Sequence, residues 1–182
     1  MSNYRRATAQ GATWFFTVVT YRRQPILCHD NIRTALRQAI GVVRQQHPFT
    51  IDGWVLLPDH LHCIWTLPPG DAGFGVRWAM IKRFVTKRCG AELRKDEWMT
   101  PSKQKRNEST IWQRRFWEHQ IRDDRDYEIH MDYLHYNPVK HGLTENVRDW
   151  PYSTFHRYVQ KGVYTKTWGS DAIANNGNQF GE

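Results

Sequence analysis

Two histidines separated by one residue are the first groups in this sequence whose types and spacing could do chemistry. His60 and His62 flank Leu61 in an apolar run that is typical of a strand. Because side chains alternate along a strand, both imidazoles point to one face, close enough to bind one divalent ion. The alternative is a pair of exposed strand histidines. The sequence has neither an HExxH pattern nor a second Cys/His pair at finger spacing, which argues against a zinc protease or a zinc finger.

A second polar group lies in a predicted helix from about Arg125 to Asn137. At 100° per residue, one stripe of this helix carries Asp126, His130, Tyr133 and Asn137. A separate, core-facing stripe carries Tyr127, Met131, Leu134 and Pro138. A tyrosine can attack a phosphate, but its pKa near 10 means that it needs a metal ion or a base beside it. The alternative is an ordinary amphipathic helix with a tyrosine at the edge of the core.

The elements around these groups must bring them together. The patterns predict strands at residues 14–21, 49–57, 60–67 and 112–121, and helices at 30–47, 74–89 and 125–137, with a short helix after Trp150. Gly90 and Pro138 are expected to end the second and third helices. The polar stretch 91–110 is predicted to be a mobile surface loop. The order predicts an α+β sandwich with helices on one face of a central antiparallel sheet.

The third strand should be apolar on the face that the helices cover. Period two places Leu61, Cys63, Trp65 and Leu67 on that face. The opposite face carries His60, His62, Ile64 and Thr66. We therefore expect the histidine pair to project from the side of the sheet away from the helices.

Length and composition indicate one folded domain. The chain has 182 residues, of which 40% are hydrophobic, and nine are Trp, which excludes a disordered chain. No apolar run approaches the roughly 20 residues of a membrane span, and no secretory leader is recognisable. The cysteines Cys28, Cys63 and Cys89 lack paired or metal-finger spacing. They are expected to be reduced thiols in a cytoplasmic protein.

The positive charge is concentrated in one part of the chain. The net charge is +8, and residues 77–106 contain ten Lys or Arg and three Asp or Glu, an excess of seven positive charges. Trp78, Phe84 and Trp98 lie within this segment. Basic residues interleaved with rings suit a nucleic-acid backbone whose bases can stack. The alternative is a solvated helix face followed by a charged loop.

Taken in order, the motifs resemble those of the REP-associated tyrosine transposases, a branch of the single-tyrosine HUH transposase superfamily. The resemblance covers residues 4 to about 168. It rests on the segments Tyr4–Arg6, Gly11–Val18, Trp54–Trp65, Trp112–His119, Asp132–Gly142 and Asp149–Phe155. One His-x-His is a weak signal, but this ordered set is highly specific.

The resemblance implies a fold, a cofactor and a site. The fold would be the ferredoxin/RRM-like sandwich of HUH endonucleases over residues 1–168, with a flexible tail at 169–182. His60 and His62 would bind a Mg²⁺ or Mn²⁺ ion together with Asn137, where the superfamily often has Gln, and Tyr133 would be the nucleophile. Three further residues are expected to position the metal ligands without binding the ion themselves: Glu118, His119 and His130.

The implied activity is cleavage and rejoining of single-stranded DNA through a 5′-phosphotyrosine on Tyr133. The implied partner is a REP-type DNA hairpin with a single-stranded flank, with no membrane partner. The protein would act as a monomer rather than as a dimer that exchanges the tyrosine helix, in the bacterial cytoplasm at the nucleoid. The candidate DNA contacts are Tyr4, Arg5, Arg6, Lys82, Arg83, Lys87, Arg88, Arg114 and Arg115.

Two other functions fit part of the sequence. A relaxase or a replication initiator would use the same HUH pair, but such proteins commonly have longer chains, a three-histidine cluster or two tyrosines. A non-catalytic RRM-like domain would explain the charge and the aromatic residues, but would give His60, His62 and Tyr133 no role. A metal-dependent nicking assay on a hairpin oligonucleotide separates the catalytic functions from the binding one.

Overall fold

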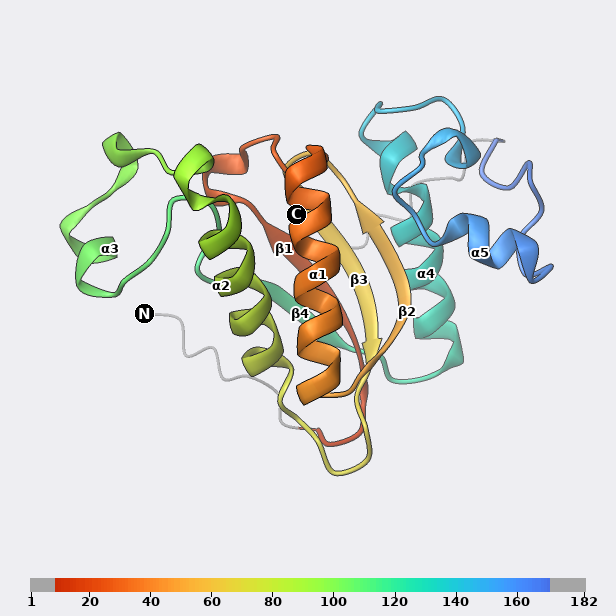
Figure 1. Cartoon of the computed structure of the whole chain (residues 1–182). Helices are drawn as coiled ribbons and strands as arrows, with labels where there is room; N and C mark the ends of the chain where they lie inside the picture. Colours follow the sequence, from red (N-terminus) through yellow and green to blue (C-terminus); the bar gives the residue numbers. More distant parts are fainter. Residues whose placement is uncertain (1–8, 171–182) are drawn as a thin grey trace.

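The computed structural model describes residues 9–170, and its centre is a four-stranded antiparallel sheet (Figure 1). The strands are β1 (Thr13–Val19), β2 (Thr50–Leu56), β3 (His60–Thr66) and β4 (Trp117–Gln120), in the order β2-β3-β1-β4. The two central strands, β3 and β1, are rich in β-branched and aromatic residues, and they pair along their whole length. The α+β architecture with an antiparallel sheet, predicted from the sequence, is confirmed.

Helices α1 (Asp30–Gln46) and α2 (Phe74–Leu93) cover one face of the sheet (Figure 1). The Trp65 ring stacks on the Trp78 ring of α2, with centroids 4.2 Å apart. The prediction that one face of β3 meets the helices is confirmed, because the large cluster contains Leu61, Cys63, Trp65 and Leu67. The alternate residues of β3, His60 and His62 among them, therefore point to the opposite face.

Helix α4 (Asp124–Lys140) lies on that opposite face, against β2 and β3 (Figure 1). The expected arrangement, with helices on one face, thus describes α1 and α2 but not α4. The reason is that the sheet is apolar on both faces, and a second cluster buries Phe15, Val55, Leu57 and Ile64 under Met131 and Leu134. Gly53 allows this approach, because a Cβ there would lie only 2.9 Å from Met131 Sδ.

The stretch predicted as a mobile loop is folded instead. Helix α2 passes Gly90, which does not adopt a positive φ, and ends at Leu93. A 3-10 turn, η2 (Asp96–Trp98), and a short helix, α3 (Pro101–Lys105), follow. The buried Lys103 ammonium lies 3.8 Å from the Tyr21 ring centre and donates a hydrogen bond to the Ser109 carbonyl at 3.1 Å. This lysine fixes the segment against the turn η1 (Tyr21–Arg23).

Two further boundaries differ from the prediction. Strand β4 is shorter than residues 112–121, because the exposed residues 113–115 have no apolar face, and Trp112 makes only an isolated bridge to Thr20. Helix α4 continues through Pro138 to Lys140. Proline lacks only its own N–H, and the Asn137 carbonyl still accepts the N–H of His141 at 3.0 Å.

The chain after α4 forms the turn η3 (Val147–Asp149) and helix α5 (Phe155–Gln160), the short helix predicted after Trp150. The predicted tail, apart from Gly169 and Ser170, lies outside the described residues, as do Tyr4, Arg5 and Arg6. Among residues 9–170, none of the helices combines the length and the hydropathy needed to cross a membrane.

Candidate active site

The two histidines of the His-x-His pair are buried at the start of β3. The exposed fractions of His60 and His62 are 1% and 0%, so the alternative of two exposed strand histidines does not hold. Their ring centroids lie 4.9 Å apart, with the planes nearly perpendicular. The strand therefore brings both imidazoles to one place on the face that α4 covers.

The Nδ1 atom of each ring is held by a neighbour. His60 Nδ1 lies 2.7 Å from the Asp59 carboxylate, and His62 Nδ1 lies 2.9 Å from the Thr17 hydroxyl. Burial alone would raise the pKa of Asp59, but hydrogen bonds and charges from His60 and Arg23 outweigh it and lower this pKa to about 2. Because a carboxylate only accepts hydrogen bonds, His60 Nδ1 donates and leaves Nε2 as the nitrogen that this ring can offer to a metal ion. His62 offers Nε2 in the tautomer in which its Nδ1 donates to the Thr17 hydroxyl.

The donor set fits a divalent ion. His60 Nε2 is buried and has no hydrogen-bond partner among residues 9–170. Buried polar atoms are normally hydrogen bonded, so an atom of this kind favours a bound metal or water. Asn137, which is fully buried on α4, can add an amide oxygen to the two imidazoles. Two nitrogens and an oxygen suit divalent metals that accept both ligand types.

Tyr133 lies beside the histidine pair. Its ring centroid is 5.3 Å from that of His62, and Phe15 lies next to both rings, stacked on His62 at 5.3 Å. Met131 and Leu134 pack in the core, as predicted for the apolar stripe, but His130 and Asn137 of the other stripe are also buried, and Tyr133 packs against the same cluster. The helix thus presents Tyr133 to the histidines, with Asn137 one turn later.

Four residues near the site were missed by the sequence analysis. Lys140 Nζ lies 3.3 Å from the Tyr133 hydroxyl, and the His141 ring centroid is 5.1 Å from that of His60. Helical spacing in the sequence could have indicated both residues, because Lys140 follows Tyr133 by seven residues and His141 follows Asn137 by four. The partners of the histidine rings, Asp59 and Thr17, were also not predicted, although Asp59 directly precedes His60.

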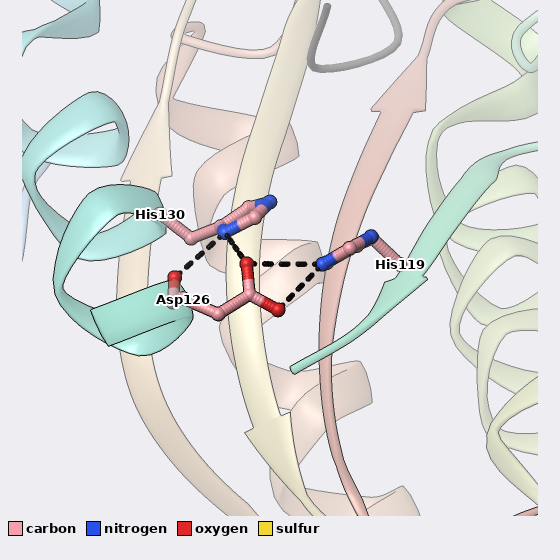
Figure 2. A group of neighbouring side chains, drawn as sticks. All are labelled: His119, Asp126 and His130. Atoms are coloured by element: carbon pink, nitrogen blue, oxygen red, sulfur yellow. Dashed lines mark hydrogen bonds and ion pairs between the residues drawn. The ribbon is translucent and has the colours of Figure 1, made fainter. Parts of the chain in front are cut away.

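His119, Asp126 and His130 form a hydrogen-bonded cluster between β4 and the first turns of α4 (Figure 2). His119 Nε2 lies 2.9 Å from one Asp126 carboxylate oxygen, and His130 Nδ1 lies 3.0 Å from the other and 2.8 Å from the Asp126 carbonyl. Burial lowers the pKa of His130. Phe15 connects this cluster to the site, because its ring contacts both His130 and His62.

Glu118 is not brought to the site. It pairs directly with Phe16 of β1, whereas His119 pairs with Phe15. Directly paired residues share a face of the sheet, and Phe16 packs in the cluster under α1 and α2. Glu118 therefore lies on the far face from Tyr133.

Part of the predicted basic set also gathers on the α2 side of the sheet. Lys82, Arg83 and Arg114 line one hollow of about 320 Å³ between α2 and residues 107–114. Lys82 Nζ donates a hydrogen bond to the Gln113 carbonyl at 2.9 Å. The remaining predicted contacts within the described residues are exposed on α2 or just before β4: Lys87, Arg88 and Arg115.

Comparisons with known proteins identify the family, although no family model matches the chain. The chain is 46% identical over 171 residues to the REP-associated tyrosine transposase of Escherichia coli (strain K12), covering 94% of this chain and 93% of that protein. It is 43% identical over 171 residues to a putative REP-associated tyrosine transposase of Haemophilus influenzae, covering 94% and 95%.

A solved structure agrees with these relatives. The structure of a REP-associated tyrosine transposase bound to a REP hairpin superimposes with a TM-score of 0.80 at 44% identity, over 98% of both chains. Identity at this level over nearly the whole length establishes common ancestry as well as a common fold. The chain belongs to the family of REP-associated tyrosine transposases.

Proposed function

We propose that this protein cleaves and rejoins single-stranded DNA next to REP-type hairpins, with Tyr133 as the nucleophile. The observation that carries the proposal is the contact between the Tyr133 ring and the buried His60–His62 pair, at 5.3 Å from His62. The related structure that contains a REP hairpin supports DNA as the partner. A binding domain without chemistry would not need a tyrosine packed against two oriented imidazoles.

The reaction is an exchange of phosphodiester bonds. The Tyr133 oxygen forms a bond to phosphorus, the bond from phosphorus to the 3′ oxygen breaks, and the phenolic proton is lost while the 3′ oxygen gains one. Lys140, whose ammonium lies 3.3 Å from the hydroxyl, stabilises negative charge on the tyrosine oxygen. Because one phosphodiester replaces another, a free 3′-OH can reverse the reaction without an external energy source.

His60, His62 and Asn137 would hold a Mg²⁺ or Mn²⁺ ion. When bound, the ion supplies charge neutralisation at the phosphate. Asp59 and Thr17 keep the two rings in place through their Nδ1 atoms. The cluster of His119, Asp126 and His130 ties the first turns of α4 to β4, and this positions Tyr133 along the helix (Figure 2).

The proposed active form is a monomer of one domain, residues 1–168, followed by the tail 169–182. In its support, α4 packs on β2 and β3 of its own chain, so the histidines and the tyrosine meet without exchange of helices. The proposed DNA contacts within the described residues are Lys82, Arg83, Lys87, Arg88, Arg114 and Arg115.

The test is formation of a covalent protein–DNA adduct. A hairpin oligonucleotide with a labelled single-stranded flank is incubated with Mg²⁺ or Mn²⁺ and analysed on a denaturing gel. The wild-type protein should form an adduct and release a fragment with a 3′-OH, whereas Tyr133→Phe should bind the DNA and form no adduct. Tyr127→Phe is the matched control, because Tyr127 lies on the core-facing stripe and contacts the Tyr158 hydroxyl.

Two results would contradict the proposal. An adduct formed by Tyr133→Phe at the wild-type rate would assign the nucleophile elsewhere. Tight binding of the hairpin by the wild-type protein, with no cleavage in either metal, would favour the RRM-like binding domain.

A further inference from the structure

A groove lined by arginines lies along the β2 edge of the sheet, between α1 and the residues around the start of α5. Strand β2 is the edge strand on this side of the sheet (Figure 1). Its volume is about 540 Å³, within the range of ligand sites. Its lining contains no Asp or Glu and includes Arg33, Arg37, Arg44 and Arg157. A groove with this composition is complementary to a polyanion. The groove lies at the opposite edge of the sheet from Arg114 and Arg115.

Three of the four guanidinium groups are held in place by backbone carbonyls. Arg44 Nε donates to the Phe49 carbonyl at 3.0 Å, and Arg33 Nε donates to the Cys28 carbonyl at 3.1 Å. Arg157 donates to the Asp52 carbonyl. Arg33 also forms an ion pair with the Asp30 carboxylate, one turn earlier in α1. Each guanidinium has five N–H donors, so these bonds fix its position and leave other donors for a ligand. A fixed cation loses less conformational entropy on binding than a mobile one.

The groove also offers aromatic surface. The Arg33 guanidinium lies 4.4 Å from the centre of the Tyr152 ring, and Trp54 is half-buried in the lining. Arginines beside rings suit phosphates joined to flat bases, because guanidinium binds phosphate through paired N–H donors. An acidic peptide would use the charges but not the rings.

The groove and the candidate active site lie on opposite faces of the β2–β3 hairpin, near its turn. Leu56, which lines the groove, is the last residue of β2 and pairs with Leu61, whose side chain packs on the α1/α2 face, whereas the two histidines that flank Leu61 point to the α4 face. A DNA strand held at Tyr133 would reach the groove by passing around the β2–β3 turn.

We propose that this groove binds the sugar-phosphate backbone of the DNA outside the segment held at Tyr133. The inference rests on the proposed function, and it adds a DNA-binding surface that the basic residues of α2 do not provide. The three arginines of α1 lie within about 40° of one another around the helix axis, since they follow at intervals of four and seven residues. All three arginines therefore lie on the side of α1 that faces the groove.

Arg37→Glu is the most direct test, because Arg37 is exposed and its replacement should not disturb the fold. With a hairpin that carries a single-stranded flank, fluorescence anisotropy should show at least tenfold weaker binding. The slope of log K against log salt should fall by about 0.9 for each phosphate that the variant no longer neutralises. Arg37→Lys, which keeps the charge but not the paired N–H donors, should retain only part of the affinity. Arg148→Glu is the control, because it makes the same charge change at an exposed position outside the groove.

Neutralised phosphates locate the contact. In a series of hairpins with single methylphosphonates, those phosphates that contact Arg37 should weaken wild-type binding but have no further effect in Arg37→Ala. Wild-type affinity and salt slope in Arg37→Glu, while the wild-type protein still forms its adduct, would overturn the groove and leave the proposed function intact. Absence of an adduct with the wild-type protein would instead remove the proposed function on which the groove depends.

Discussion

The Lys140 ammonium and the Tyr133 hydroxyl form a contact of 3.3 Å, and the same nitrogen lies 4.8 Å from the centre of the tyrosine ring. Seven residues are nearly two helical turns, so α4 presents both side chains on one side. A cation in this position stabilises negative charge that develops on the tyrosine oxygen during attack on a phosphate. The spacing of seven residues in the sequence thus places a positive charge beside the proposed nucleophile.

Lys140→Met should slow formation of the covalent adduct by about ten- to a hundredfold. A charge-assisted hydrogen bond contributes about 1.5–3 kcal/mol, and each 1.4 kcal/mol corresponds to a tenfold change in rate. Single-turnover kinetics at saturating DNA measure this effect, and Lys140→Arg should restore part of the rate. Lys161→Met is the control, because Lys161 lies over the Tyr158 ring away from the site. An unchanged rate in Lys140→Met would exclude this role.

Thr17→Val should weaken the binding of Mn²⁺ by about ten- to a hundredfold, the usual cost of losing a partner that orients a metal ligand. Valine keeps the shape of the side chain but removes the hydroxyl 2.9 Å from His62 Nδ1. Isothermal titration with Mn²⁺ measures the affinity. Thr13→Val, on the same strand, removes a hydroxyl that bonds to Thr66 at 2.8 Å, and should leave the metal affinity unchanged. Equal losses in the two variants would show a general effect on the sheet.

Asp71→Asn should reduce stability in a pH-dependent way. The hydrogen bond from Arg77, which is 1% exposed, lowers the pKa of Asp71 below its usual value. The stabilisation is therefore fully present above the unfolded-state pKa of about 3.9 and is lost as the pH falls through the folded-state pKa. Removing the carboxylate charge leaves the buried Arg77 guanidinium without its counter-charge, although it still donates to the His47 and Pro48 carbonyls, and this costs about 1–3 kcal/mol at pH 7.

Urea unfolding at pH 7 and near pH 3 tests this pair, and the difference between wild type and Asp71→Asn should shrink at the lower pH. Asp96→Asn is the matched control, because the Arg94–Asp96 pair is exposed and contributes at most about 1 kcal/mol. A penalty that does not change with pH would assign the effect to packing.

Periodicity was sufficient for the elements that carry the site. The alternation in β3 correctly assigned His60 and His62 to one face of the sheet and Leu61 and Cys63 to the other, because successive side chains of a strand point to opposite faces. The spacing in α4 likewise grouped Tyr133 with Asn137, although Tyr133 also packs against the cluster that contains Met131. Both are local consequences of backbone geometry.

Long-range packing was the part that periodicity did not give. The position of α4 on the second face depends on Gly53, which gives no helix or strand signal of its own. The order in residues 96–105 depends on one buried lysine, Lys103, packed on Tyr21 from a distant segment. Arg33, Arg37 and Arg44 were overlooked for a different reason: the charge count favoured residues 77–106, although the helical spacing of these three arginines was present in the sequence.

Gly53→Ala should show how closely α4 must approach the sheet. A Cβ at this position would lie 2.9 Å from Met131 Sδ and 3.2 Å from Leu134 Cδ1, so the helix or these side chains must move. Overpacking costs about 1–3 kcal/mol, and we expect the lower end of this range by urea unfolding, because Met131 Sδ and Cε are the end of a flexible side chain that can move aside. Because α4 carries Tyr133, adduct formation should also slow under conditions where the variant remains folded. Gly41→Ala, with no neighbour within 4 Å of its new Cβ, should instead stabilise helix α1 by about 0.5–1 kcal/mol. If Gly53→Ala instead has wild-type stability and rate, the second cluster accommodates a methyl group without a shift of the helix. The position of Tyr133 beside His62 would then not depend on this contact.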